Sequence, residues 1–239
     1  MSTERNDGAK RETVVANRAV ADGGTEPETV VVTPNDLPER DGHPDRNVGG
    51  VLLAAGPGER YEGDRIKLLA EVDGTPIVAR AASALTESEL DEVAVVLGHE
   101  ADAVREALAA LDVTIVENEQ YREGQSTSMQ RGVETARDRG WDALVFGLGD
   151  MPFLDPAVTD LLLRVYDAGY GPLIAAGFEG KRGNPTLFDE AFYDDLMAVN
   201  GDTGGRPVLM GSSSITVVET GEPGVLQDID TRADYESYL

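Results

Sequence analysis

Hydrophobic residues from Val48 onward occur in short runs, separated by longer stretches in which polar and apolar residues mix. Short apolar runs that stop at a glycine or a polar residue are typical of strands that are buried on both faces of a sheet. This pattern predicts strands at residues 48–54, 93–97, 113–116, 143–146, 173–176 and 215–218.

Helix-capping residues precede several of the stretches between these runs. We expect Thr75 to cap a helix with Pro76 at its first position, and Ser126 or Thr127 to cap another. Helices are predicted over residues 75–85, 101–110 and 155–166, from about residue 126, and after Thr231. Strands that alternate with helices predict an α/β fold, a three-layer sandwich in which helices cover both faces of a mainly parallel sheet.

The first 47 residues lack this alternation. They are rich in Glu, Asp, Thr, Pro and Gly, and their one notable apolar cluster is Val30–Val32. Such a segment buries too little apolar surface to offset the entropy lost when it becomes ordered. We therefore predict a disordered or loosely attached acidic tail over residues 1–47 and a single domain over residues 48–239.

The composition excludes several classes of site. The chain has no cysteine, which rules out disulfides, thiolate metal sites and cysteine nucleophiles. No apolar run reaches membrane-spanning length and the first residues form no apolar signal core, so we expect a cytoplasmic protein without membrane contact.

The formal net charge is −25, and the acidic residues are spread along the chain. Only three of the 20 basic residues are lysines. Scattered acid with few lysines favours adaptation to high salt, where self-repulsion is screened, and makes nucleic acid an improbable partner.

A glycine-rich turn follows the first predicted strand. Gly56-Pro57-Gly58 lets the backbone come close to a ligand, and Arg60 and Lys67 follow it with positive charge. Successive N–H groups in such a turn bind anions, as a nucleoside triphosphate requires. The sequence matches neither the Walker pattern nor G-x-G-x-x-G, and the turn on its own is compatible with an ordinary strand-to-helix connection.

Two aspartate positions could hold a metal ion. Asp150 follows an apolar strand and therefore lies at the edge of the sheet where ligands bind in this fold class. Asp228 and Asp230 follow the last strand. Mg²⁺ is usually held by one or two carboxylates together with phosphates and water, although each of these aspartates could instead cap a helix or stabilise a turn. The sequence does not decide whether Asp228 or Asp230 is the second ligand.

Three further polar segments and one histidine fall near the same edge. Residues 124–128 begin a helix, whose free N–H groups suit a base or a phosphate, or simply a cap. Polar, glycine-rich turns are expected at residues 180–185 and 201–206, and they suit an acceptor-binding face better than plain surface loops. His99 is expected to line the site rather than to act as a catalytic base.

These segments together resemble the molybdenum cofactor cytidylyltransferase family, which belongs to the MobA-like nucleotidyltransferases with a glycosyltransferase-A-like, Rossmann-like fold. The resemblance runs from about residue 48 to residue 239. It rests on Leu53-Ala54-Ala55-Gly56 with Arg60 and Lys67-Leu68-Leu69, Gly124-Gln125-Ser126-Thr127-Ser128, Gly149-Asp150-Met151-Pro152, Arg182-Gly183-Asn184-Pro185, Gly201-Asp202-Thr203-Gly204-Gly205-Arg206 and Asp228-Ile229-Asp230-Thr231.

The resemblance implies roles for individual residues. Arg60, Lys67 and Asp150 would be catalytic, and Asp150 and Asp230 would bind Mg²⁺. The nucleotide would be bound by Leu53, Ala54, Ala55, Gly56, Lys67, Asn118 and Ser126.

The function implied is Mg²⁺-dependent transfer of a nucleoside monophosphate from an NTP to a phosphorylated acceptor, with release of pyrophosphate. Ala55 stands where guanylyltransferase relatives usually have a second glycine, which favours CTP as donor and molybdopterin as acceptor. A molybdoenzyme or its chaperone is a further expected partner. The alternatives are transfer of GMP or another nucleotide to a different phosphorylated acceptor, and a non-catalytic nucleotide-binding factor in molybdenum cofactor maturation.

The charge composition predicts how stability depends on salt. We expect the melting temperature to rise from dilute buffer to molar KCl, because screening relieves the repulsion among the 45 acidic residues. Thermal unfolding followed by circular dichroism over a KCl series measures this. A melting temperature that stays flat or falls over that range would contradict adaptation to high salt.

Overall fold

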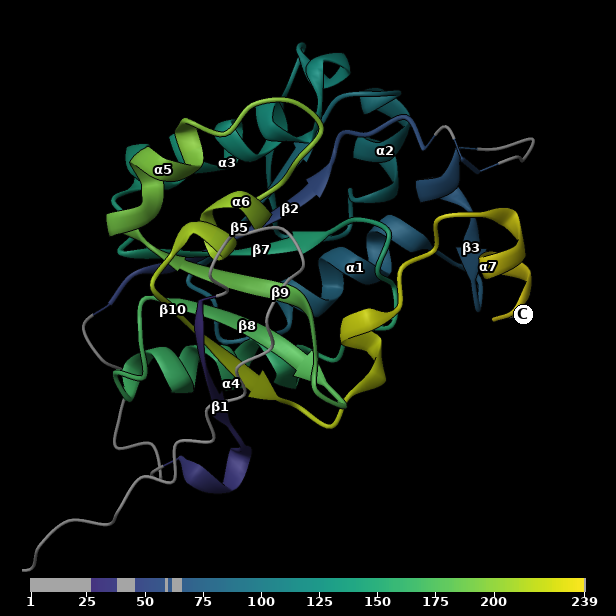
Figure 1. Cartoon of the computed structure of the whole chain (residues 1–239). Helices are drawn as coiled ribbons and strands as arrows, with labels where there is room; N and C mark the ends of the chain where they lie inside the picture. The colour runs from purple at the N-terminus through teal and green to yellow at the C-terminus, as the bar shows by residue number, and fades with distance from the viewer. Residues whose placement is uncertain (1–26, 38–45, 59, 62–65, 239) are drawn as a thin grey trace, which may run out of the picture.

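The computed structural model describes residues 27–37, 46–58, 60–61 and 66–238. Within these residues, eight strands form one sheet in the order β1-β10-β8-β9-β7-β2-β5-β6 (Figure 1). All neighbouring strands are parallel except β9, which is antiparallel to both β7 and β8. The strands are β1 Glu28–Val32, β2 Val48–Ala54, β5 Glu92–Leu97, β6 Thr114–Glu117, β7 Ala143–Leu148, β8 Leu173–Phe178, β9 Lys181–Asp189 and β10 Ser214–Glu219.

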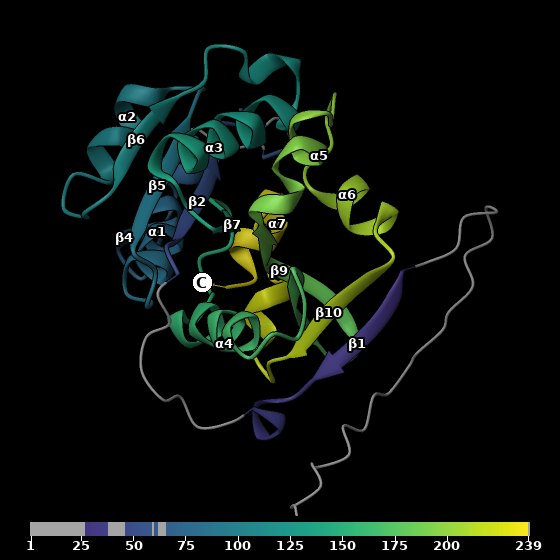
Figure 2. The same cartoon turned by 90° about the vertical axis from the view of Figure 1, so that its left-hand side faces the viewer.

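Helices cover both faces of this sheet, which makes the three layers visible in Figure 2. One face is covered by α1 (Ile77–Thr86), α2 (Ala101–Ala107) and α4 (Pro156–Asp167). The other is covered by α3 (Gln125–Arg139), α5 (Tyr193–Met197) and α6 (Arg206–Gly211). The short helix α7 (Arg232–Glu236) and the small β3–β4 pair (Glu71–Val72 and Thr75–Pro76) lie beside the main sheet.

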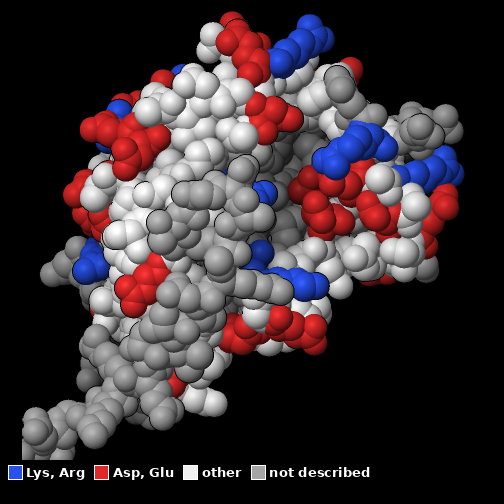
Figure 3. Space-filling model, viewed as in Figure 1, with Lys and Arg blue, Asp and Glu red and all other residues white. Residues whose placement is uncertain are grey.

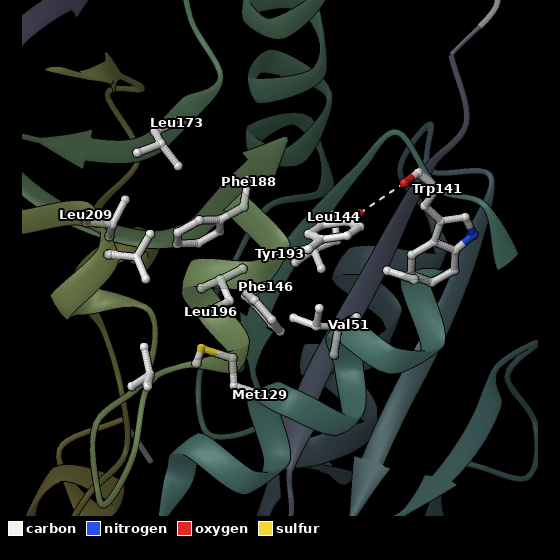
Figure 4. Packing of buried hydrophobic residues seen from close by; sticks show 14 of the residues in the cluster. Val51, Met129, Trp141, Leu144, Phe146, Leu173, Phe188, Tyr193, Leu196 and Leu209 are labelled. Atoms are coloured by element: carbon white, nitrogen blue, oxygen red, sulfur yellow. Dashed lines mark hydrogen bonds between the residues drawn. The ribbon is translucent and has the colours of Figure 1, made fainter. Parts of the chain in front are cut away.

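Alternating residues of the central strands pack into hydrophobic cores on the two faces of the sheet. Val51 of β2 faces α3, while its neighbour Leu52 faces α1. In the core under α3 and α5, the rings of Phe146 and Phe188 meet edge to face with their centroids 5.9 Å apart (Figure 4). The buried Tyr193 hydroxyl donates a hydrogen bond to the Trp141 carbonyl oxygen (3.1 Å), so this buried polar group is satisfied.

The fold class predicted from the sequence is confirmed, and each of the six predicted strands is present within one or two residues of its expected bounds. The predicted helix at residues 155–166 is also confirmed as α4, which the Asp155 carboxylate caps by accepting a hydrogen bond from the Ala157 N–H (2.9 Å), with Pro156 at the first position. Thr231 caps α7 in a reciprocal capping box with Asp234.

The prediction of a disordered segment up to residue 47 is wrong for residues 28–32, which form the edge strand β1. Val30–Val32 pairs in parallel with Thr216–Val218 of β10. Val32 is only 1% exposed and packs with α4. The short apolar cluster could not bury its surface alone, but it does so by pairing with β10 at the edge of the sheet. The other parts of this segment, residues 1–26 and 38–45, lie outside the described residues, and a domain boundary at residue 48 stays a prediction.

The polar turn predicted at residues 180–185 is also placed wrongly. The turn is formed by Glu179 and Gly180, both with φ in the left-handed region, and it pairs Phe178 directly with Lys181. Two such residues are what a tight hairpin requires. The chain then continues as β9, in which Gly183 is overlain by the main chain of Val225: a Cβ at residue 183 would lie 2.1 Å from the Val225 carbonyl oxygen.

Two predicted helix caps are replaced by other residues. Pro76 rather than Thr75 precedes the first turn of α1, because Thr75 and Pro76 pair with β3. Gly124 rather than Ser126 or Thr127 precedes α3, with φ at +115°. A Cβ at residue 124 would lie 2.4 Å from the main chain of Gly201, so the loop at residue 201 excludes a larger cap. No helix within the described residues combines the length and the apolar character needed to cross a membrane.

The position of Val32 provides a test of β1. Val32→Asp places a carboxylate in the core next to α4 and should lower the free energy of unfolding by about 1–3 kcal/mol. Asn35→Asp adds the same charge at an exposed site three residues further on and should have little effect. Urea denaturation measures both. Equal effects of the two substitutions would mean that residues 28–32 do not pair with β10.

Candidate functional site

A cleft of about 1070 Å³ opens at the carboxyl ends of the parallel strands. Figure 3 shows a hollow on this side of the molecule, with both basic and acidic side chains at its rim. Its walls come from the ends of β2 and β7, the segments after β5 and β6, the start of α3 and the segment before α7. The lining residues are Leu53, Ala54, Ala55, Gly56, Pro57, Gly58, Arg60, Lys67, Leu68, His99, Tyr121, Arg122, Glu123, Gly124, Gln125, Ser128, Leu148, Asp150, Asp202 and Asp230.

The loop after β2, residues 55–58, forms the floor of the cleft. The Ala55 carbonyl oxygen accepts a hydrogen bond from the His99 N–H (3.0 Å), which ties the loop to the end of β5. Gly56 is exposed, and a Cβ built there would meet no atom within 4 Å. Gly58 has φ at +65° and lies against the side chain of Lys67. The loop therefore presents open backbone to the cleft next to a lysine, as an anion site requires.

Four charged side chains meet beside this loop. The Lys67 ammonium lies 2.8 Å from Oδ2 of Asp150 and 3.5 Å from Oδ1 of Asp230. The Arg60 guanidinium lies 2.9 Å from Oδ2 of Asp230. The Lys67 side chain is only 9% exposed, whereas that of Arg60 is 75% exposed. The predicted catalytic and metal-binding residues are thus brought together in one cluster.

Main-chain hydrogen bonds bring the two aspartates together from distant parts of the chain. The Gly149 N–H donates to the Leu53 carbonyl oxygen (2.9 Å), so Asp150 begins level with the end of β2. The Ile229 N–H donates to the Asp150 carbonyl oxygen (2.9 Å), and the Ile229 side chain is fully buried under α1. Asp230 follows and faces the cleft. The buried isoleucine therefore fixes which of the nearby carboxylates faces Asp150.

The donor set suits a divalent metal ion that also binds phosphate. Oδ1 of Asp150 is buried and has no hydrogen-bond partner, whereas Oδ2 is held by Lys67. No group of three or more His, Asp or Glu side chains suited to a metal occurs within the described residues. A cation bound here would take carboxylate oxygens from Asp150 and Asp230 and its remaining ligands from phosphate and water, as Mg²⁺ does.

Asp228 does not line this cleft. Partial burial raises the pKa of its carboxyl, and the negative charges of Asp230 and Asp150 raise it further. Asp230, in contrast, lines the cleft and contacts both Lys67 and Arg60. The geometry therefore favours Asp230.

Aromatic and polar side chains form the opposite wall. Tyr121, Arg122 and Glu123 form the short 3₁₀ helix η3 (Tyr121–Glu123), which packs against the end of β5. The rings of His99 and Tyr121 have centroids 6.0 Å apart, and the Arg122 guanidinium lies 5.3 Å from the Tyr121 ring centroid. Planar groups beside the loop after β2 suit a nucleobase.

Asn118 and Ser126 do not line the cleft. Asn118 is 2% exposed, and its amide donates to the hydroxyls of Thr127 and Ser128, both at 2.9 Å. Its side-chain oxygen accepts from the Gln120 N–H (3.0 Å). The Ser126 N–H donates to the Gly201 carbonyl oxygen (3.1 Å). Both residues stabilise the start of α3 on the side away from the cleft. Their assignment to the nucleotide stays a prediction.

Some cleft residues are absent from the predicted site. Tyr121 and Arg122 lie in a segment with no periodicity or motif. The one sequence signal for their place in the cleft is that they follow the predicted strand at residues 113–116. His99 lines the cleft as expected, and Asp202 lines it from the predicted turn at 201–206. Arg182 lies in β9 instead, where its guanidinium lies 3.3 Å from Sδ of Met210.

Comparison with protein-family models matches residues 50–216 to the MobA-like NTP transferase domain. Among curated proteins, the bifunctional protein GlmU of Nitratidesulfovibrio vulgaris is 34% identical over 116 residues, which are 48% of this chain and 25% of that protein. GlmU of Rhizobium rhizogenes is 28% identical over 157 residues, 63% of this chain and 33% of that protein. The match thus spans no more than about a third of the length of these relatives.

Solved structures share the fold over most of the chain. A nucleotidyl transferase from Methanothermobacter thermautotrophicus has a TM-score of 0.70 and 25% identity, covering 81% of this chain and 96% of that one. Rv0371c from Mycobacterium tuberculosis has a TM-score of 0.68 and 24% identity, covering 82% and 99%. A further structure of Rv0371c is a complex with manganese, with a TM-score of 0.63, 24% identity and coverage of 81% and 98%.

The contact between Gly98 and Tyr121 provides a test of the aromatic wall. A Cβ at residue 98 would lie 2.7 Å from Cβ of Tyr121 and 2.9 Å from the Ala55 carbonyl oxygen. Gly98→Ala should therefore lower the free energy of unfolding by about 1–3 kcal/mol, through overpacking of a backbone that cannot yield. Urea denaturation measures this.

Gly211→Ala is the matched control, because a Cβ there would meet nothing within 4 Å. Adding Tyr121→Gly to Gly98→Ala should recover part of the loss, because glycine lacks the Cβ that the new methyl group would meet. A fully stable Gly98→Ala variant would mean that Tyr121 does not pack against the end of β5.

Proposed function

The chain belongs to the family of MobA-like NTP transferase domains, and from this membership and the cleft we propose that it is a nucleotidyltransferase. It transfers a nucleoside monophosphate from an NTP to a phosphorylated acceptor and releases pyrophosphate. The single observation that carries the proposal is the charged cluster beside the loop after β2. There Lys67 contacts both Asp150 and Asp230, and Arg60 contacts Asp230.

The cluster supplies both kinds of group that the reaction needs. The open backbone at Gly56 and the cations of Lys67 and Arg60 suit the β- and γ-phosphates of an NTP. The unpartnered oxygen of Asp150 and the carboxylate of Asp230 suit Mg²⁺. His99 and Tyr121 suit the base. The triphosphate would thus extend from the aromatic wall toward the carboxylates.

The reaction is a direct displacement. An oxygen of the acceptor phosphate attacks the α-phosphorus, and the bond from that phosphorus to the oxygen that bridges the α- and β-phosphates breaks as the new bond forms. Pyrophosphate leaves with the bonding pair. Lys67 and Arg60 offset the negative charge that develops on it, so no covalent enzyme intermediate is needed.

A divalent metal ion, which we propose to be Mg²⁺, would be held by Asp150 and Asp230. When bound, it neutralises phosphate charge and polarises the α-phosphorus. The chain's own carboxylates would position it, and without it the Lys67 ammonium near both of them offsets their like charges.

We favour CMP as the transferred group and molybdopterin as the acceptor. The support is Ala55, which follows β2 and lines the cleft, with its methyl group largely buried in the core on the α3 side where a glycine would leave space. A methyl group there disfavours a purine relative to a pyrimidine by about 1–3 kcal/mol. The alternative is transfer of GMP or another nucleotide to a sugar or alcohol phosphate in the same cleft. The experiment must distinguish this reaction from transfer of CMP to molybdopterin.

The test is a screen of CTP, GTP, ATP and UTP against phosphorylated acceptors, molybdopterin included, with Mg²⁺ at high salt. We expect release of pyrophosphate, fastest with CTP. Asp150→Asn should lower turnover by two orders of magnitude or more, because it removes charge stabilisation that operates mainly in the transition state. Asp138→Asn removes a carboxylate from an exposed position of α3 and should leave turnover unchanged.

Each failure has a distinct meaning. A preference for GTP would remove the cytidylyl assignment and keep the enzyme class. Full turnover of Asp150→Asn would remove the metal assignment. Binding of an NTP without release of pyrophosphate for any acceptor would favour a non-catalytic nucleotide-binding factor in cofactor maturation.

A further inference from the structure

Cations already cover most of the carboxylate oxygens that a metal ion would use. Both oxygens of Asp230 have a cationic partner, Lys67 on Oδ1 and Arg60 on Oδ2. Oδ2 of Asp150 is held by Lys67, and only Oδ1 of Asp150 has no partner. The two positive and two negative side chains sum to zero charge. A divalent cation entering this neutral cluster would meet two repelling cations and one uncovered oxygen.

The same two cations are the groups that a polyphosphate would attract. Lys67 lies against Gly58 of the phosphate-binding loop, with its Cβ 3.2 Å from the position that a Cβ of Gly58 would take. Its backbone is fixed in the 3₁₀ helix η2 (Lys67–Leu69), whereas its four-carbon stem can swing the ammonium between carboxylate and phosphate. Arg60 is largely exposed and can turn in the same way.

Transfer of these cations to phosphate would leave Asp150 and Asp230 uncovered. The two carboxylates would then be like charges in a partly buried site, and a divalent cation would be their natural partner. Resting on the proposed function, we infer that Lys67 and Arg60 occupy the metal carboxylates in the free protein and yield them when a polyphosphate binds. Metal and nucleotide then bind with positive coupling, which is reciprocal by thermodynamic linkage.

The two cations differ in how strongly they oppose the metal. Lys67 contacts both carboxylates and its side chain is only 9% exposed, so solvent screens its charge poorly. Arg60 contacts Asp230 alone from an exposed position. Removal of the Lys67 ammonium should therefore change metal affinity more than removal of the Arg60 guanidinium. This order separates a local effect from a general effect of net charge.

The experiment measures Mn²⁺ binding to the full chain without nucleotide, by isothermal titration and by electron paramagnetic resonance. Lys67→Met keeps the apolar stem and removes the ammonium, and we expect Mn²⁺ to bind at least tenfold more tightly than to the wild type. Arg60→Gln should tighten binding by a smaller factor and, being exposed, is expected to fold. Arg131→Gln, which removes a cation paired with Glu134 on the surface of α3, should leave binding unchanged.

The reciprocal arm measures NTP binding with EDTA present. Asp230→Asn releases Arg60 and partly releases Lys67, so metal-free NTP should bind several-fold more tightly. Unchanged or weaker Mn²⁺ binding to both Lys67→Met and Arg60→Gln would overturn the inference, because the cations would then support the metal site or leave it unaffected. Equal tightening by Arg131→Gln would overturn it as well. If the wild-type chain turned over none of the four NTPs, the proposed function alone would be refuted, because the Mn²⁺ measurements do not depend on turnover.

Discussion

Strand β2 is confined on all four sides, and the position of the cleft depends on this confinement. It is hydrogen-bonded to β5 on one edge and to β7 on the other, with α1 and α3 packed on its two faces. There is no space for a side chain at Gly49, where a Cβ would lie 2.2 Å from the Trp141 indole. At Gly132 of α3, a Cβ would lie 2.6 Å from Val51. Backbone packed this closely cannot shift without cost, so the loop after β2 emerges at a fixed point.

The aspartate that faces this loop is fixed by the same strand. Gly149 is hydrogen-bonded to Leu53, and a Cβ at residue 149 would lie 3.1 Å from that of Ala54. The loop after β2 and Asp150 are therefore held at fixed positions by one rigid pairing between β2 and β7. Asp230 reaches the pair from the far end of the chain, through the hydrogen bond from Ile229 to Asp150. Preorganisation of this kind keeps the charges in place before any ligand binds.

Much of this arrangement could be predicted from the sequence, because the relevant signals are local. The run from Val48 to Ala54 predicts one buried strand, and the run from Ala143 to Phe146 predicts another. In a parallel sheet, the second strand places Asp150 at the edge where the carboxyl ends of the strands lie. Strand β1 could not be predicted, since Val30–Val32 is too short to bury itself and depends on β10, which lies far away in sequence. Strand β9 was hidden because Gly183 and Pro185 suggest a turn, whereas the hairpin turn is at Glu179 and Gly180.

The site itself shows the same division between local and distant signals. Lys67 lies between Asp150 and Asp230, which follow it in the sequence by 83 and 163 residues. The order of the motifs could suggest this contact but could not establish it. Asn118 does not line the cleft, and its assignment to the nucleotide stays a prediction. Its type and its position after a strand suggest a ligand contact, yet both amide donors are taken by Thr127 and Ser128 and the side chain is buried.

A buried amide with both donors satisfied contributes by holding the start of α3, because breaking either bond would leave a buried donor unsatisfied. The start of α3 carries Gln125 and Ser128 into the cleft, and the preceding η3 carries Tyr121 and Glu123. Tyr121 and Glu123 therefore come from a segment whose sequence has no regular pattern, whereas Gln125 and Ser128 come from a predicted helix start. The packed strands fix where the loop after β2 and Asp150 lie, and the irregular segment at residues 121–123, next to the start of α3 that Asn118 holds, forms the aromatic wall of the cleft.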